Sequence, residues 1–338
     1  MDDGLTDDTF EEGQVSEVTA FACHGANQAV CACHFDDALA ALGDPNVRVW
    51  INFLAPDQAH LLKVVAKLGF HELAVEDVFS PRSRAKIEEY AGHLFCIMPA
   101  LNPNTEADPF DTINLNAFLG SNYLITAQRA PLPAVAALKY ELERGSASVR
   151  RGPDFALYRL LDAIVDEYLP LADAIGERIE ALEERIFEQF DRTVSADIFR
   201  LKRDVALLRR RMGPQREIIN SLTNRPHEMI SPETQIYLRD VYDHVFRIND
   251  NVDTFRDLLQ GALDSYLTQV SNRTNEVMKL LSIVATIVLP LNMLTGLYGT
   301  NFGYLPGAEN PYGFWIFCAG LLSVGLLATL LFRLRRLL

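Results

Sequence analysis

Basic residues are absent from the first 47 positions of this 338-residue chain, and Arg48 is the first of them. Ten acidic residues lie in the same stretch, so they account for most of the formal net charge of −14. Because nucleic-acid binding needs a basic surface, this excess of acid argues against a nucleic-acid partner. Residues 1–17 combine acidic charge with few large apolar side chains, and we expect them to form a disordered tail.

Motifs typical of enzymes are also missing. The chain has no phosphate-binding loop, no nucleophile elbow and no dinucleotide fingerprint, which argues against ATP-driven pumping. The segment HELAV begins like the zinc-protease helix motif but carries Val75 where the second histidine ligand would stand. The sequence therefore predicts a protein that is not an enzyme and that requires no cofactor.

Charge is missing from two long apolar runs near the C-terminus, residues 280–298 and 311–332. Nineteen helical residues rise about 28 Å, which matches the hydrocarbon thickness of a bilayer. The connection between them, residues 299–310, contains no Lys or Arg, whereas Lys279 precedes the first run and the basic tail 333–338 follows the second. By the positive-inside rule, we expect two membrane spans with both chain termini in the cytoplasm. The acidic start does not resemble a signal peptide, so the expected location is the cytoplasmic (inner) membrane.

Cysteine is scarce, with five residues in all, and a cytoplasmic compartment disfavours structural disulfides. Three of the five lie with two histidines within twelve residues, and thiolates and imidazoles suit Zn²⁺. The spacing matches no standard zinc finger. If the segment is a β-hairpin, the three cysteines could face one side and pack in the core, which we favour over a zinc-binding role. The five residues of this cluster are Cys23, His24, Cys31, Cys33 and His34.

Residues 18–232 read as a cytoplasmic α+β domain with a mixed sheet and long helices. Alternating or continuous apolar runs predict strands at 18–23, 29–35, 47–54, 93–101, 112–120 and 122–128. A helix is expected after Pro56-Asp57 that stops at Gly69, and helical spacing with dense opposite charges predicts two long helices over 154–189 and 195–222.

A stalk helix is predicted over residues 233–279, and no proline interrupts the chain between Pro232 and Pro290. The stalk helix should therefore run directly into the first span. Apolar residues recur at alternating gaps of four and three, and such a heptad seam predicts partner helices and assembly. The seam consists of Val241, Val245, Ile248, Val252, Phe255, Leu259, Ala262 and Tyr266.

One face of the first span carries polar and small side chains, including Asn292 at mid-membrane depth. Two interpretations stay open from spacing alone: polar contacts between packed helices, or the lining of a water-filled path. Two helices cannot enclose a channel, so a pore would need several subunits around an axis. The seam of the stalk helix favours this second interpretation.

The segment YGTNF, residues 298–302, resembles the Tyr-Gly-Met-Asn-Phe signature of the CorA family of divalent-cation channels. Four further blocks resemble family patterns in the same order: HELAVEDV (71–78), AKIEEYAGHLF (85–95), LLDAIVDEYLP (160–170) and NEVMKLLSIVATIVLPL (275–291). The resemblance thus covers most of the chain.

The resemblance implies a funnel-shaped homopentamer in which the first span lines the pore and Gly299, Thr300 and Asn301 form the selectivity filter. A ring of Asn301 amides could hold the water shell of Mg²⁺, which dehydrates reluctantly. Hydrated divalent cations and the lipid bilayer are then the expected partners, with cations as both transported and regulatory ligands. The resemblance assigns Met278 and Leu281 to a hydrophobic constriction, and the full set of implied pore-lining residues is Ser271, Asn275, Met278, Leu281, Ser282, Ala285, Leu289 and Asn292. It assigns cytoplasmic metal sensing to Glu76, Asp77 and Asp264.

The chain departs from the family pattern in two places. Thr300 replaces the methionine of the signature, and the outer loop carries only one acid, Glu309, which is more similar to the ZntB branch that moves Zn²⁺. The sequence therefore predicts a transporter of Mg²⁺, Co²⁺, Ni²⁺ or Zn²⁺ without choosing among them. Two alternatives remain open: a proton-coupled or efflux-type Zn²⁺ transporter, and a non-conducting membrane-anchored metal sensor.

Overall fold

The computed structural model describes residues 16–24, 30–80, 83–105, 108–145, 148–188, 191, 193–300 and 310–334. Residues 1–15 of the predicted acidic tail, Asn301, Glu309 and the last four residues lie outside this part of the chain. The predicted end of the tail at residue 17 is wrong, because Glu17 is the first residue of a strand. Two compact units are present. The first comprises residues 1–183 and 196–260, and the second comprises residues 184–195 and 261–338.

The first unit is built on a seven-stranded sheet in the order β2-β1-β3-β7-β6-β5-β4. Only β3 and β7 are parallel, and every other neighbouring pair is antiparallel, so the predicted mixed sheet is confirmed. The strands are β1 (Glu17–His24), β2 (Cys31–Cys33), β3 (Val47–Leu54), β4 (Lys86–Tyr90), β5 (His93–Leu101), β6 (Thr112–Leu119) and β7 (Tyr123–Gln128).

The amino-acid composition of each strand reflects how deeply the strand is buried in the sheet. β3 and β7 lie inside the sheet and are apolar on both faces, which is why continuous apolar runs revealed them. The edge strand β4, with the sequence KIEEY, was not predicted because its residues are mostly charged and only half-buried. Such charged edges protect a sheet from pairing with another chain. The strand predicted over 29–35 is shorter in the structure, since His34 occupies the N-cap position of a helix that begins at Phe35.

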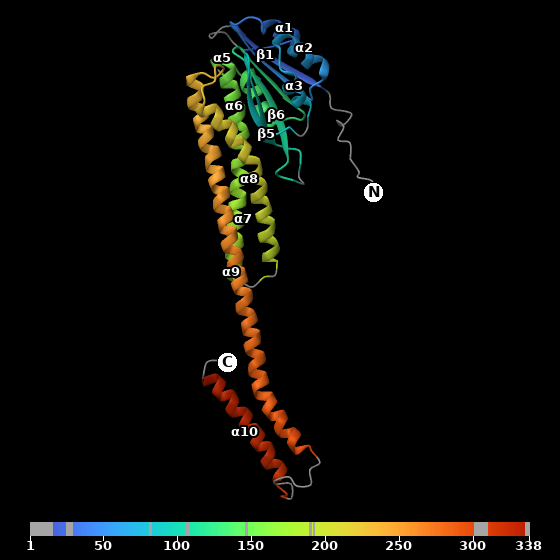
Figure 1. Ribbon diagram of the computed structural model, residues 1–338, viewed down its shortest axis with the longest axis vertical. Coiled ribbons are helices and arrows are strands. Elements are labelled where there is room, and N and C mark those ends of the chain that lie inside the picture. The colour runs from blue at the N-terminus through green and yellow to red at the C-terminus, as the bar shows by residue number, and fades with distance from the viewer. Residues whose placement is uncertain are drawn as a thin grey trace, which may run out of the picture. The chain divides into compact units, whose positions relative to one another are not determined.

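Helices cover both faces of the sheet (Figure 1). On one face, α1 (Phe35–Ala41), α2 (Gln58–Leu68) and α3 (Glu72–Phe79) pack over a core that includes Phe53 and Phe118. On the other face lie α4 (Pro133–Glu143), α5 (Ser148–Arg151) and α6 (Pro153–Asp166). The predicted stop of α2 is confirmed, because Gly69 adopts the left-handed conformation with φ of 67°.

The helix predicted over 154–189 is divided in two. α6 ends at Asp166 and α7 (Tyr168–Glu188) begins after Glu167. Pro170, which lacks an N–H group, stands in the first turn of α7 and cannot donate to the end of α6. α8 (Val194–Asn224) follows, and α9 (Pro232–Tyr298) is a single helix of 67 residues.

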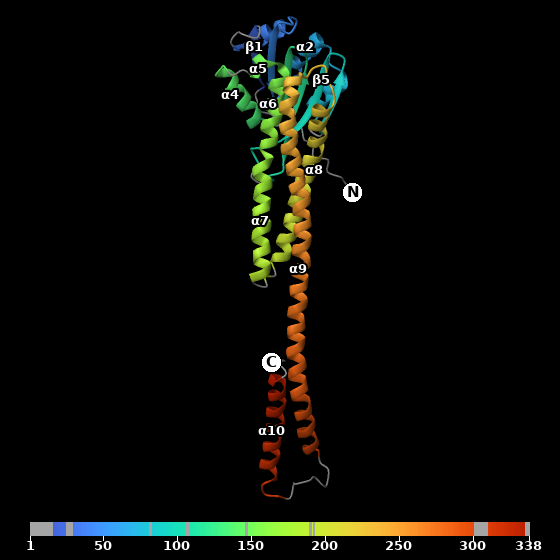
Figure 2. The same ribbon diagram turned by 90° about the vertical axis from the view of Figure 1, so that its left-hand side faces the viewer.

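The heptad seam of α9 is already covered within one chain. Six of its eight residues are buried, namely Val241, Val245, Ile248, Val252, Leu259 and Ala262. In the first unit α7 and α8 lie beside the N-terminal part of α9 (Figure 1, Figure 2). A Cβ on Gly176 of α7 would lie 3.3 Å from the Phe255 ring, and Lys202 of α8 donates to Gln260 over 3.0 Å. The expectation that this seam calls for other subunits is therefore wrong, because helices of the same chain fill it.

In the second unit, the C-terminal part of α9 runs beside α10 (Gly313–Leu334). Both helices contain stretches long and apolar enough to cross a membrane, with almost nothing in those stretches buried by the chain. The structure therefore contains the long helix and the two candidate C-terminal spans that the sequence predicts.

Candidate cation sites

The C-terminal part of α9 presents two different faces. Ile283 is buried, and Ile287 and Leu291, one and two turns later, are half-buried. Leu291 lies 3.8 Å from where a Cβ on Gly325 of α10 would stand, and Tyr298 contacts the Phe317 ring at a centroid distance of 4.3 Å. This face of α9 is therefore the one that packs on α10.

The predicted pore-lining residues lie on the opposite face. At about 100° per residue, Ser282, Ala285, Leu289 and Asn292 point away from Ile283 and Ile287. All four are exposed in the single chain, as are Ser271, Asn275, Met278 and Leu281. The polar face of α9 thus does not pack against α10. Contact between these two helices therefore does not explain why this face is polar.

The end of α9 shapes the start of the predicted filter. Gly299 N–H donates to the Thr295 carbonyl over 2.9 Å, and Thr300 Oγ1 donates to the Leu297 carbonyl over 2.6 Å. The Thr300 hydroxyl therefore satisfies the helix end rather than standing free. Asn301 lies outside the described residues, and its role remains a prediction.

Of the predicted sensing residues, Glu76 and Asp77 lie together near the end of α3. Asp77 is already engaged: its Oδ2 lies 2.7 Å from Lys86 Nζ, and its Oδ1 accepts a 2.7 Å hydrogen bond from Ser83 Oγ. Asp264 lies on α9 in the second unit, where it is exposed. The family resemblance of the sequence points to these carboxylates but does not predict that a lysine contacts one of them.

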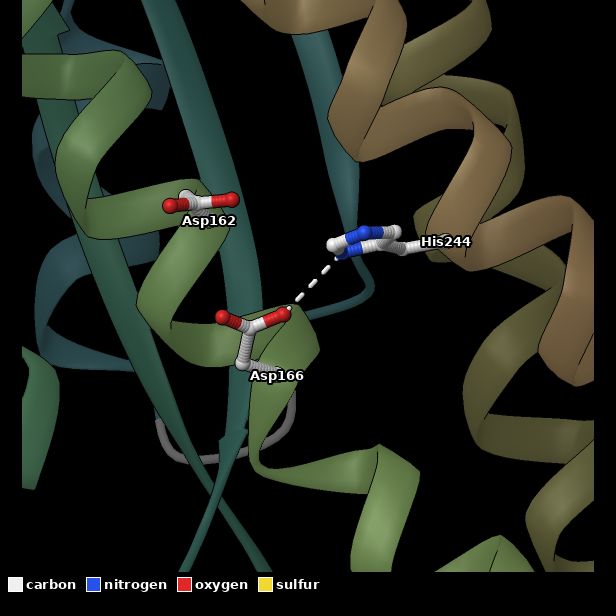
Figure 3. A group of neighbouring side chains, drawn as sticks. All are labelled: Asp162, Asp166 and His244. Atoms are coloured by element: carbon white, nitrogen blue, oxygen red, sulfur yellow. Dashed lines mark hydrogen bonds and ion pairs between the residues drawn. The ribbon is translucent and has the colours of Figure 1, made fainter.

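A further cluster unites α6 with α9 in the first unit (Figure 3). Asp162 and Asp166 stand one turn apart on α6, and His244 comes from α9. The ligand atoms of all three lie within 4.8 Å of one another, and His244 Nδ1 is 3.1 Å from Asp166 Oδ1. Among the residues that the structure describes, this is the one group of three His, Cys, Asp or Glu side chains with such spacing.

The electrostatics of this cluster favour a cation. Burial raises the pKa of Asp162, and the nearby carboxylates of Asp166 and Asp240 raise it further. Arg159 opposes this shift with a 3.1 Å contact to Asp162, but its guanidinium also binds Glu141. A bound cation would relieve the repulsion among the carboxylates, and two carboxylates with one imidazole are ligands suited to borderline metals such as Zn²⁺ and Co²⁺.

This cluster was not predicted from the sequence. Asp162 and Asp166 lie in the block LLDAIVDEYLP, which served only as a family pattern, and His244 was not considered at all. The spacing of four residues, typical of two ligands on one helix face, was the available signal for the two aspartates. Nothing in the sequence pairs them with a histidine that lies 78 positions beyond Asp166.

The cysteine–histidine segment does not form a comparable group. The register pairs Cys31 with Ala22 and Cys33 with Ala20, so Cys23 alternates to the opposite face of the sheet. Cys23 is buried, whereas Cys31, His24 and His34 are exposed. The idea that all three cysteines face one side is therefore wrong. No three of the five residues, all of them described, bring ligand atoms within the spacing seen at His244.

An α/β domain, two candidate membrane spans and clustered carboxylates define a membrane protein suited to handling cations. Residues 46–336 match the family described as "CorA-like Mg2+ transporter protein". The chain belongs to this family, which is one of transporters rather than enzymes.

Known relatives agree with the family assignment. The chain is 33% identical over 273 residues to "Cobalt/magnesium transport protein CorA" of Thermotoga maritima, covering 80% of this chain and 78% of that one. It is 24% identical over 293 residues to "Zinc transport protein ZntB" of Pectobacterium carotovorum, covering 85% and 82%. The solved structure of the CorA magnesium transporter from Methanocaldococcus jannaschii has the same fold, with a TM-score of 0.76, 23% identity and coverage of 93% and 97%.

Proposed function

We propose that this protein moves divalent metal cations across the cytoplasmic membrane along a path lined by the polar face of α9. The observation that carries the proposal is the position of Asn292 and Ser282 on the face of α9 opposite Ile283 and Ile287, which pack toward α10. Mid-membrane amides are costly unless they meet protein or water. Because α10 packs on the other face of α9, the candidate neighbours of Asn292 are water and the same face of α9 in other copies of the chain.

A closed path requires several copies of this helix, and the family relationship supports a homopentamer. The seam of the stalk helix gives no support for assembly, since helices of the same chain cover it. In the assembly, Asn301 would supply a ring of amide oxygens at the outer mouth and Asn292 a second ring within the span. Met278 and Leu281 would form the apolar constriction between the path and the cytoplasm.

Regulation by cytoplasmic cations is the second part of the proposal. The cluster of Asp162, Asp166 and His244 joins α6 to α9, so a cation bound there would fix the N-terminal part of the helix that continues into the span. Asp77, Glu76 and Asp264 would contribute further sensing carboxylates. Bound cation stabilises one arrangement of α9, and its loss releases that arrangement.

Flux of Mg²⁺, Co²⁺ and Zn²⁺ into liposomes containing the full-length protein, followed with a metal-sensitive dye, tests the transport proposal. Wild type should conduct at least one of the three ions, and Asn301→Ala should lose most of that flux. Binding of metal with no flux of any ion would instead favour a membrane-anchored sensor. Flux that is unaltered by Asn301→Ala would refute the amide ring.

Zinc transport is the alternative substrate assignment, and one observation favours it. His244 contributes an imidazole to the cluster on α6 and α9, and imidazole is a Zn²⁺ ligand rather than a Mg²⁺ ligand. Comparing initial rates for Mg²⁺ and Zn²⁺ with and without an imposed pH gradient decides between the two. A Zn²⁺ rate that ignores the gradient would exclude proton coupling.

A further inference from the structure

Two arginines from separate elements converge on the face of the sheet that α4, α5 and α6 cover. Arg48 on β3 is the direct cross-strand neighbour of Cys23 on β1, so the two side chains point to the same face. That face is opposite Ala22, which belongs to the core under α1, α2 and α3. Arg150 comes from α5, which packs on β3. Within the described part of the chain, neither arginine forms an ion pair with a carboxylate.

The thiol of Cys23 lies close to both of these positive charges. Cys23 is fully buried, and burial raises the pKa of its thiol, whereas Arg48 and Arg150 oppose that shift. Among the described residues, the other titratable group that acts on Cys23 is the thiol of Cys31, and no carboxylate contributes. The two guanidinium groups therefore stand beside one buried sulfur without a negative charge to compensate them.

Each arginine also carries an N–H group that is shielded from water. Arg48 Nη1 and Arg150 Nε are buried, and neither has a hydrogen-bond partner among the residues that the structure describes. Arg150 Nη2 donates to the Gly145 carbonyl over 3.1 Å, which holds this guanidinium group in place. Buried donors without an acceptor are costly, and the great majority in folded proteins are paired with protein, water or an ion. The two unpaired donors and the two positive charges therefore fit an anion with at least two acceptor oxygens.

A phosphoryl group satisfies both requirements. Its oxygens match the planar fork of a guanidinium group, and its charge of about −1.5 to −2 near pH 7 offsets two arginines, whereas a carboxylate offsets only one. Water can accept from the two donors but cannot neutralise the charges. Phe21 and Trp50 stack beside Arg48 on the same face, with ring centroids 5.8 Å apart, and their apolar surface strengthens the attraction between opposite charges.

We propose that Arg48 and Arg150 bind a phosphoryl oxyanion, either inorganic phosphate or the terminal phosphate of a nucleotide. The site shares no residue with the candidate cation sites, so it does not rest on the proposed transport function. Arg151, the next residue of α5, donates to the Tyr237 hydroxyl on α9 over 3.1 Å. An anion held by Arg150 therefore also stabilises the segment that contacts the start of α9.

Binding of inorganic phosphate to the full-length, detergent-purified protein tests the proposal by isothermal titration calorimetry. Wild type should bind phosphate, and Arg48→Gln should weaken this binding about tenfold or more, which corresponds to the loss of one hydrogen bond to a charged group. Arg48→Lys keeps the charge but loses the planar fork, so its affinity should lie between the two. The matched control is Arg203→Gln, which removes an exposed arginine from α8 and should bind like wild type.

Melting temperatures separate a ligand site from an arginine that only supports the fold. Phosphate stabilises proteins in general by strengthening apolar burial, so the informative quantity is the difference between variants, each compared with KCl at equal ionic strength. Phosphate should raise the Tm of wild type and Arg203→Gln more than that of Arg48→Gln. In KCl alone, Arg48→Gln should melt no lower than wild type, because it removes a like-charge repulsion and an unpaired buried donor. Equal responses of all three proteins to phosphate would overturn the proposal.

ADP, added after divalent metal has been removed with a chelator, distinguishes the two sources of the phosphoryl group. Tighter binding of ADP than of phosphate, weakened in Arg150→Gln, would assign the site to a nucleotide, and binding of phosphate alone would assign it to the free anion. If wild type binds neither, the proposal is wrong. None of these measurements involves cation flux, so the outcome is independent of the proposed transport function.

Discussion

His244 Nδ1 lies 3.1 Å from Asp166 Oδ1, and this contact joins α9 to the end of α6. The two residues are 78 positions apart in the chain. Asp162, one turn before Asp166, completes the group, and its pKa is raised first by burial and then by Asp166. The contact brings an imidazole to a pair of carboxylates, and these are side-chain types that bind Zn²⁺ and related metal ions.

Replacing His244 with Ala should weaken binding of Co²⁺ or Zn²⁺ to the purified protein about tenfold or more, since even losing a hydrogen-bonding partner of a metal ligand typically costs that much. Competition with a fluorescent chelator measures this affinity. His60→Ala is the matched control, because His60 pairs with a single aspartate, Asp57, at 2.7 Å and belongs to no cluster. Equal affinities in wild type and His244→Ala would exclude His244 as a ligand.

Asn292→Leu should lower cation flux more than tenfold, because it removes the mid-membrane amide from the polar face of α9. Ile287→Leu, on the face toward α10, keeps volume and polarity and should conduct like wild type. Liposome flux of both variants at equal protein content gives the comparison. If Asn292→Leu conducts normally, the path does not run along this face.

Glu167, in the break between α6 and α7, should make folding pH-dependent. Burial raises its pKa from 4.5 to about 7, so the folded state holds a proton that the unfolded state releases. The contribution of this group to stability is therefore fully present below pH 4.5 and is lost as the pH rises through 7. Glu167→Gln should flatten this part of the stability curve and stabilise the protein at pH 8 by on the order of 1 kcal/mol, allowing for partial exposure.

Melting temperatures in detergent between pH 4.5 and pH 8 check this prediction. Wild type should lose stability relative to Glu167→Gln across that interval. A constant difference between the two proteins at every pH would mean that Glu167 does not titrate there.

Asp154 anchors the segment that leads into α9. Its Oδ2 accepts hydrogen bonds from the Ser231 N–H over 3.0 Å and from the Ser231 hydroxyl over 2.7 Å, and its side chain is buried. Asp154→Ala should cost about 1–3 kcal/mol of unfolding free energy, because buried donors lose their acceptor. Thermal unfolding measures the loss, and Asp173→Ala, an exposed position on α7, should change it by less than about 0.5 kcal/mol.

The structural features that depend only on residues close together in the chain could be predicted from the sequence. Charge-free runs of membrane length, apolar strands such as β3 and β7, and the stop of α2 at Gly69 each depend on neighbouring residues. The polar strand β4 escaped prediction because an edge strand needs little apolar burial. The family signature at 298–302 pointed to the transporter class, but the position of Asn301 lies beyond the described residues.

Only the tertiary structure decided which elements pack against each helix face and which side chains contact one another. The heptad seam of α9 predicts that its apolar residues pack against other helices. Periodicity does not determine whether those helices belong to another subunit or are α7 and α8 of the same chain. In the same way, the sequence identified Asp77 and the LLDAIVDEYLP block, while packing alone brought Lys86 to Asp77 and His244 to Asp166. The physical reason is that the periodicity of a sequence determines which face of a helix or strand a side chain occupies. A site forms only when the fold brings the faces of separate elements into contact.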